Sequence, residues 1–224
     1  MEIASREGLE RSTVGLDDFI EEIDDDGVSE TRTSSNTWVD REYSPIIDSI
    51  YRRAADLMRI DEALFRKRNE YDEHIDGVDD RRECAESLQL VHYNVSQEYL
   101  PHHDFGYPSH WDELKHQEQR FATLLLYLSE DMIGGQTSFP RWHNAETFEA
   151  LRCEPELGKA VLFYSQLPDG NMDEYSQHAA RPVFDGEKYL INLWVKDPII
   201  PEDDADDEEE DDDDDDDEDE DDVE

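Results

Sequence analysis

The chain has 224 residues, of which 63 are acidic and 20 are basic, and its formal net charge is −43. Of the last 24 residues, 21 are Asp or Glu, so residues 1–200 still carry a net charge of −22. This charge argues against nucleic acid or an anionic membrane as a direct partner. No apolar run reaches the roughly 20 residues of a membrane-spanning helix, and the first residues lack the apolar core of a signal peptide.

The composition predicts one folded domain over residues 1–200 and an acidic tail over residues 201–224. The tail has almost no apolar side chains and its charges repel one another, so we expect it to be disordered. Two interpretations of the tail stay open, namely a basic partner and simple solubility. Two cysteines, Cys84 and Cys153, fit either a reduced compartment or a single disulfide.

The clearest helix begins after an irregular, polar stretch over residues 1–30 and a predicted strand within residues 31–40. Ser44 suits its N-cap and Pro45 its first turn. Helical spacing predicts one buried apolar face formed by Ile46, Ile47, Ile50, Tyr51, Ala54, Leu57 and Met58. The charged stretch over residues 67–86 is predicted to be a loop.

From Leu88 onward the sequence changes to short aliphatic and aromatic segments separated by Gly, Pro, Asp or Asn. The segments are LQLVHYNV, YLPHHDF, FATLLLYL, GQTSFP, KAVLFYS, SQHAARPV and KYLINLWV. This pattern is typical of an antiparallel β sandwich or barrel. We therefore predict a mostly β fold with a flanking helix packed on the outside of a sheet.

The segment YLPHHDFG contains a His-x-Asp pair, His102 and Asp104. On an extended strand these two side chains point to one face and His103 points to the other. One imidazole and one carboxylate supply two of the three ligands of a facial iron site, if another histidine arrives from elsewhere. The alternative for an isolated His-x-Asp is a polar surface strand.

His178 is the best candidate for the missing ligand. It lies on a predicted strand, a turn follows at Asp185–Gly186, and Lys188 starts the next strand. If these strands are antiparallel neighbours, His178 and Lys188 reach the same pocket. A lysine deep in a barrel needs an anion, and a ligand carboxylate would provide it. A surface lysine beside a turn is the alternative.

These segments resemble the prolyl 4-hydroxylases in order and in motifs. The similarity covers residues 8–198 and includes His-x-Asp, a distant His, a Lys ten residues later, G-G-x-T, P-D-G and an upstream R-T-S segment. This family consists of iron(II)- and 2-oxoglutarate-dependent dioxygenases with a double-stranded β-helix, or jelly roll. The resemblance therefore implies that fold and that class of reaction.

The resemblance also implies roles for individual residues. The iron ligands would be His102, Asp104 and His178. The 2-oxoglutarate carboxylate would be held by Lys188, Thr137 and Tyr93. The substrate side of the pocket would include Arg120, Tyr99, Trp194, Arg32 and Ser34. His103, between two ligands, is interpreted as structural.

By resemblance, the cofactors are Fe(II), 2-oxoglutarate and O2, with ascorbate as the reductant. The expected reaction hydroxylates peptidyl proline and releases succinate and CO2. Tyr99 and Trp194 would then line a groove for a proline-containing peptide in polyproline II form. Two alternatives stay open. One is a dioxygenase of the same class with a non-prolyl substrate, and the other is a non-catalytic binding protein with an acidic tail.

The start of the chain, MEIASREGLERS, resembles the end of a helix in this family. We therefore expect the chain to lack the family's usual N-terminal strand and helix, where a leader or membrane anchor would lie. The compartment is left open between the endoplasmic reticulum and the cytoplasm. Lys196 stands where better-known members often have a histidine, which predicts a different substrate contact.

Overall fold

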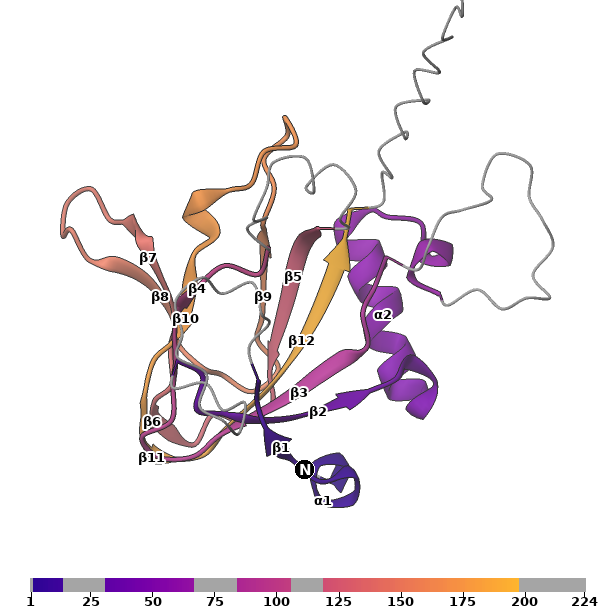
Figure 1. Ribbon diagram of the computed structural model, residues 1–224, viewed down its shortest axis with the longest axis horizontal. Helices are drawn as coiled ribbons and strands as arrows, with labels where there is room; N and C mark the ends of the chain where they lie inside the picture. The colour runs from indigo at the N-terminus through magenta and orange to yellow at the C-terminus, as the bar shows by residue number, and fades with distance from the viewer. Residues whose placement is uncertain (1, 14–30, 67–83, 106–118, 198–224) are drawn as a thin grey trace, which may run out of the picture.

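A computed structural model describes residues 2–13, 31–66, 84–105 and 119–197 (Figure 1). The predicted tail over residues 201–224 and most of the predicted loop over residues 67–86 lie outside these ranges. Within the described residues, the helices are all too short or too polar to cross a membrane.

Most of the regular secondary structure in the described residues consists of antiparallel strands. A six-stranded sheet has the order β1 (Glu10–Arg11), β2 (Ser35–Val39), β3 (Leu88–Tyr93), β12 (Lys188–Lys196), β5 (Arg120–Tyr127) and β9 (Ala160–Tyr164). A four-stranded sheet has the order β4 (Tyr99–His102), β10 (His178–Ala180), β7 (Thr137–His143) and β8 (Ala150–Cys153). A third pairs β11 (Val183–Gly186) with β6 (Met132–Gly134).

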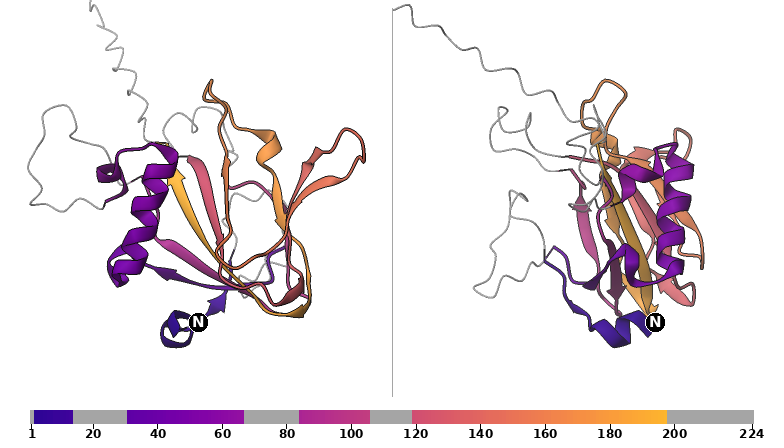
Figure 2. Two further views of the ribbon diagram at one scale, coloured as in Figure 1. Left: turned by 180° about the vertical axis from the view of Figure 1, so that it is seen from behind. Right: turned by 90° about the vertical axis from the view of Figure 1, so that its right-hand side faces the viewer.

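The two larger sheets diverge from the end at which β6 and β11 lie (Figure 1). The main helix, α2 (Pro45–Met58), covers the outer face of the six-stranded sheet, as Figure 2 also shows. The remaining helical segments are α1 (Glu2–Glu7), η1 (Arg41–Tyr43), η2 (Glu62–Phe65) and η3 (Glu174–Ser176). The prediction of a mostly β fold with a flanking helix is confirmed.

Helix α2 begins where the sequence predicts. The side chain of Ser44 accepts a hydrogen bond from the backbone N–H of Ile47 at 3.3 Å, and Pro45 occupies the first turn. The predicted buried face is wrong at its two edges, because Ile46 and Leu57 are 73% and 56% exposed. The helix touches the sheet along a narrower stripe than the apolar spacing suggests, so residues at the margins of that stripe face water.

Side-chain alternation along the central strands separates a helix-facing core from a pocket. On β12, Ile191, Leu193 and Val195 belong to the core that includes α2. Lys188, Leu190, Asn192 and Trp194 alternate with them and line the pocket between the sheets. Strand β3 follows the same rule, and all six of its residues are buried because both of its faces are covered.

Candidate active site

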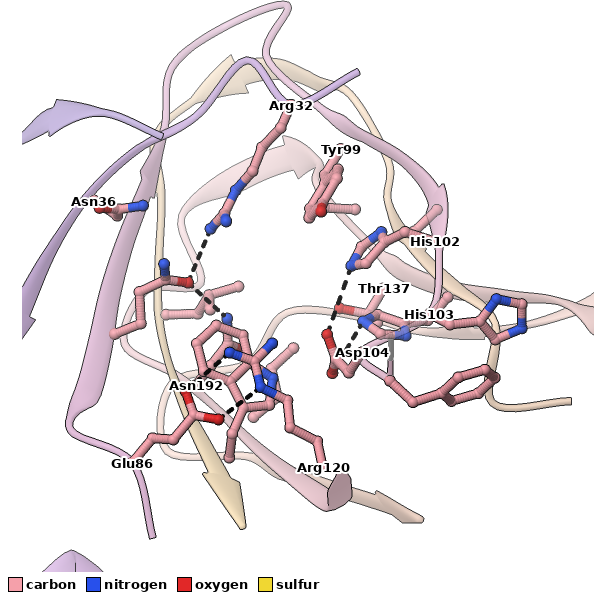
Figure 3. A pocket seen from close by; sticks show the side chains of 18 of the residues that line it. Arg32, Asn36, Glu86, Tyr99, His102, His103, Asp104, Arg120, Thr137 and Asn192 are labelled. Atoms are coloured by element: carbon pink, nitrogen blue, oxygen red, sulfur yellow. Dashed lines mark hydrogen bonds and ion pairs between the residues drawn. The ribbon is translucent and has the colours of Figure 1, made fainter. Parts of the chain in front are cut away.

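A pocket of about 450 Å³ lies between the two larger sheets. Figure 3 shows Arg32, Tyr99, His102, Asp104 and Arg120 arranged around it. The described lining residues include every side chain predicted for the site except Ser34. Ser34 is fully buried behind Arg32, whose Nε donates to the Ser34 hydroxyl at 3.2 Å.

The three predicted iron ligands lie together at one side of this pocket. One ligand atom from each of His102, Asp104 and His178 can be chosen so that all lie within 4.8 Å of one another. His102 Nε2 lies 3.9 Å from Asp104 Oδ1, and His178 Nε2 lies 3.6 Å from Asp104 Oδ2. His102 comes from β4 and His178 from β10, and these residues are direct partners in the antiparallel pairing of the two strands.

Hydrogen bonds orient both imidazoles toward Asp104. His102 Nδ1 lies 2.8 Å from the Leu100 carbonyl oxygen, and His178 Nδ1 lies 3.0 Å from the Ser176 carbonyl oxygen. Because a carbonyl only accepts, each Nδ1 carries the proton and each Nε2 keeps its lone pair for a metal. Burial lowers the pKa of His102 to about 3, which keeps this imidazole neutral.

Asp104 is held as a carboxylate. Burial opposes its ionisation, but electrostatic interactions with His178, His102 and Arg120, together with a hydrogen bond from Thr123, outweigh burial and hold its pKa well below the ordinary value. The hydroxyl of Thr123, on β5, donates to Asp104 Oδ2 at 2.6 Å. The prediction that Asp104 lies on the strand with His102 is wrong, because β4 ends at His102 and Asp104 lies in the bend that follows. This bend still turns the carboxylate toward both imidazoles.

Lys188 occupies the pocket as a buried cation. It is 0% exposed, and its Nζ has no hydrogen-bond partner among the described residues. Nζ lies 5.0 Å and 5.7 Å from the ring centroids of Tyr93 and Tyr127. Burial lowers the pKa of Lys188 to about 7. An ammonium in this position favours a ligand that brings a negative charge.

The other residues predicted to hold a carboxylate lie beside Lys188. Thr137 and Tyr93 are both buried and both line the same pocket. The Tyr127 hydroxyl donates to Thr137 Oγ1 at 2.7 Å, so the Thr137 hydroxyl can donate its own proton to a ligand. Burial raises the pKa of Tyr93, which keeps its phenol protonated.

The G-G-x-T segment brings β6 and β7 close to the Lys188 side chain. Gly135 has a positive φ of 70°, and a Cβ added to it would lie 3.2 Å from Lys188 Cδ. Glycine is therefore needed both for this backbone conformation and for the close approach.

The sequence-based explanation of how His178 and Lys188 meet is wrong. Strand β10, which carries His178, pairs with β4 and β7, whereas β12, which carries Lys188, pairs with β3 and β5. Strand β11 lies between them in the chain. The two residues therefore face the same pocket from opposite sheets and are not neighbours on one hairpin.

Arg120 and Trp194 form one wall of the pocket mouth. The Arg120 guanidinium lies 3.7 Å from the Trp194 ring centroid and makes two hydrogen bonds, of 2.7 and 2.9 Å, to the Glu86 carboxylate. Trp38 packs against Trp194 with ring centroids 5.8 Å apart. Because Glu86 neutralises Arg120, this wall offers aromatic surface and directed donors without a free positive charge.

Arg32 and Tyr99 form the opposite wall. Tyr99 stacks on the ligand-candidate His102 with ring centroids 3.5 Å apart, and the Arg32 guanidinium lies 4.9 Å from the Tyr99 ring centroid. Arg32 also donates to Gln89 Oε1 at 2.9 Å. The pocket therefore joins the cluster of potential metal ligands to a polar and aromatic mouth.

Comparison with known proteins identifies relatives of this chain. Residues 88–196 match the model of the 2OG-Fe(II) oxygenase superfamily. The chain is 33% identical over 181 residues to probable prolyl 4-hydroxylase 3 of Arabidopsis thaliana, covering 75% of this chain and 55% of that protein. It is 31% identical over 166 residues to the prolyl 4-hydroxylase subunit alpha-1 of Gallus gallus, covering 73% of this chain and 27% of that protein.

Residues 88–196 form a 2OG-Fe(II) oxygenase domain, and the chain is similar to the prolyl 4-hydroxylases over about three quarters of its length. It spans about half the length of the plant relatives it matches. A solved viral collagen prolyl hydroxylase from Paramecium Bursaria Chlorella virus-1, in its 2OG complex, has a TM-score of 0.54 and 25% identity to the chain. That match covers 74% of this chain and 80% of the viral one, and it confirms the predicted jelly roll.

Several side chains in or beside this pocket were absent from the sequence-based prediction. Trp38, Glu86, Gln89 and Asn192 line the pocket, and Tyr127 lies behind the lining and donates to Thr137. Glu86 and Gln89 are polar residues that precede or begin a buried strand, and only strand pairing brings them to Arg120 and Arg32. Alternation along β12 was a usable signal for Asn192, since it shares a strand face with Lys188 and Trp194.

His103 gives a test of which histidine of the pair belongs to the candidate metal site. Its ring points away from the centre of the pocket (Figure 3), and its Nε2 lies 3.2 Å from the Glu174 carbonyl oxygen. We expect His103→Ala to retain iron, measured by metal analysis after gel filtration, and to lose about 1 kcal/mol of unfolding free energy. Loss of iron by this variant in a folded state would contradict the choice of His102.

Proposed function

We propose that the chain is an Fe(II)- and 2-oxoglutarate-dependent dioxygenase that hydroxylates proline residues in a peptide. The observation that carries this proposal is one pocket shared by the His102–Asp104–His178 cluster and by Lys188, whose Nζ has no hydrogen-bond partner within the described part of the chain. In the reaction, one oxygen atom of O2 enters the substrate C–H bond and the other enters succinate, with loss of CO2.

The residues fit both cofactors. Two neutral imidazoles and one carboxylate form the ligand set that non-haem Fe(II) oxygenases use, and they leave coordination positions open. The buried ammonium of Lys188 fits the distal carboxylate of 2-oxoglutarate, since a ligand of this kind supplies the charge that the described residues lack. When bound, iron and 2-oxoglutarate together supply the activation of O2.

The protein's part is to bind, orient and exclude water. Thr123 fixes Asp104, and the Leu100 and Ser176 carbonyls fix the two imidazoles. Lys188 with the hydroxyls of Thr137 and Tyr93 would anchor 2-oxoglutarate by its distal end. The apolar side chains of Leu125 and Leu190 line the pocket and limit access of water.

The mouth supports a peptide substrate. A proline-rich segment has few backbone N–H donors but keeps all of its carbonyl acceptors, so it is recognised by donors and aromatic faces. Arg32, Arg120 and the indole N–H of Trp194 are donors at the mouth, and Trp194 Nε1 has no hydrogen-bond partner among the described residues. Tyr99 and Trp38 add aromatic surface beside them.

The direct test is mass spectrometry of proline-containing peptides incubated with the protein, Fe(II), 2-oxoglutarate and ascorbate. The proposal predicts a gain of one oxygen on proline and an equal amount of succinate. Succinate without peptide hydroxylation would indicate another substrate for the same chemistry. Absence of both products from a folded, iron-loaded protein would contradict a catalytic role and favour a binding protein.

The pKa of Lys188 predicts how the affinity for 2-oxoglutarate depends on pH. In the ligand-free protein this pKa is about 7, so Lys188 loses its proton as the pH rises above 7. The dissociation constant for 2-oxoglutarate should be nearly constant below pH 7 and rise by up to about tenfold per pH unit above it. Calorimetry in buffers of different ionisation enthalpy should show proton uptake on binding at pH 8. Binding without proton uptake would contradict an ammonium–carboxylate contact.

Two parts of the proposal rest on sequence and family alone. Ascorbate is the proposed reductant, and omission of ascorbate from the peptide assay should reduce the number of turnovers per iron. The acidic tail over residues 201–224 is proposed to contact a basic partner.

A further inference from the structure

A pair of exposed aromatic side chains lies outside the pocket and has no role in the chemistry proposed above. Trp142 belongs to β7 and Tyr175 to η3, and their ring centroids are 5.6 Å apart with an interplanar angle of 55°. Their exposed fractions are 53% and 55%. Half-exposed aromatic surface of this kind is a common feature of binding sites.

The backbone holds this aromatic pair in place. Phe139 pairs with Leu151 and His143 pairs with Ala150, so residues 140–142 of β7 have no counterpart on β8. Such a bulge re-aims side chains, here toward η3. Arg141, inside the bulge, forms an ion pair with Glu174 and donates to Gln177 Oε1 at 3.2 Å, so it ties the bulge to the chain around η3.

The aromatic pair is continuous with the candidate active site. Segment η3 ends at Ser176, two residues before the potential metal ligand His178. The Glu174 carbonyl also lies 3.2 Å from Nε2 of His103, which lines the pocket. In Figure 1 the β7–β8 hairpin projects from the sheet on this side, far from β11. The aromatic pair therefore lies beside the segment that leads to His178.

The size of the aromatic pair favours a narrow ligand. Two aromatic side chains that are about half exposed offer roughly 200 Å² of surface. This is far below the ~800 Å² per partner of a stable protein–protein interface. A polyproline II segment needs only a narrow aromatic surface, because its prolines are already ordered and project from a thin helix.

We propose that Trp142 and Tyr175 form a second docking site for an extended proline-rich segment of the substrate, adjacent to the pocket. This inference rests on the proposed function for its choice of ligand. The site would bind residues of the peptide that are not hydroxylated, and it would increase the affinity for long substrates over short ones.

Direct binding tests the docking site without any turnover. The probe is a fluorescein-labelled Ser-Pro repeat of about 20 residues, which is roughly 60 Å long in polyproline II form. We expect Trp142→Ala and Tyr175→Ala each to weaken its binding to the metal-free chain by about five- to tenfold in fluorescence anisotropy. Phe184→Ala is the matched control, because Phe184 is an aromatic residue that is 65% exposed on β11. The inference is overturned if either aromatic variant binds like the control, or if the wild type does not bind the probe.

A kinetic comparison separates docking from a direct effect on the pocket. The ratio of kcat/KM for the long repeat to kcat/KM for a repeat of about five residues should fall about five- to tenfold in Trp142→Ala. Equal losses for the two lengths would overturn the docking role. If the wild type binds the long repeat through Trp142 but hydroxylates no proline, the docking site stands and the proposed function fails. Self-association that depends on Trp142, without peptide binding, would identify a second copy of the chain as the ligand and overturn the inference.

Discussion

His178→Ala should lose iron and lower 2-oxoglutarate turnover by more than about 100-fold. The substitution removes one of three ligand candidates and leaves His102 and Asp104 with two donors, too few to hold iron firmly. The measurement is metal content after gel filtration, followed by succinate formation with excess Fe(II). Iron retention with full turnover would contradict the proposed metal site.

A second variant distinguishes the loss of a metal ligand from a folding defect. His178 is buried, and its ring lies 4.6 Å from that of Phe163, so alanine also leaves a cavity. His178→Gln keeps most of the side-chain volume but lacks the imidazole. Both variants should lose turnover, whereas only the alanine variant should lose unfolding free energy beyond about 1 kcal/mol. Retained activity in both variants, with lower stability in the alanine variant alone, would show that His178 only fills space.

Lys188→Met should stabilise the ligand-free chain while greatly weakening 2-oxoglutarate binding. The folded-state pKa of Lys188 is about 7 and the ordinary value is 10.5, so folding carries a penalty for charging Lys188. The penalty is complete below pH 7 and disappears as the pH approaches 10.5. The gain in unfolding free energy should therefore be on the order of a few kcal/mol at pH 6 and decrease toward pH 10.

Although Lys188→Met should stabilise the ligand-free chain, it should impair the use of 2-oxoglutarate. We expect KM for 2-oxoglutarate to rise by about 100-fold, with iron content retained, because a charged hydrogen bond is lost. Stability should be measured by urea unfolding at both pH values, with and without 2-oxoglutarate. Lys159→Met is the control, since Lys159 pairs with Glu156 near the surface. A wild-type KM in Lys188→Met would contradict the anchoring role.

Local patterns were sufficient for much of the fold. Ser44 and Pro45 predicted the start of α2 because caps act within a few residues. The apolar segments after Leu88 predicted strands, including the strand that begins at Lys188. The family motifs predicted a three-residue cluster, and the structure brings those three side chains together.

Sequence patterns could not predict contacts between segments that are distant in the chain. The hairpin expected between His178 and Lys188 was wrong, because chain order does not specify which of the two sheets a strand joins. Glu86 reaches Arg120 across 34 residues, and Gln89 reaches Arg32 across 57. The exposure of Ile46 follows from the limited width of the α2 contact with the sheet, which helical spacing does not reveal.

The measurement that tests the account most directly is an anaerobic titration of the Fe(II)-loaded chain with 2-oxoglutarate, followed by visible absorption. Circular dichroism would verify the fold of each sample. The account predicts a saturable band for the wild type, the same band at much higher 2-oxoglutarate concentration for Lys188→Met, and no band for His178→Ala. A folded, iron-loaded wild-type chain that gives no band at any 2-oxoglutarate concentration would contradict the proposed site.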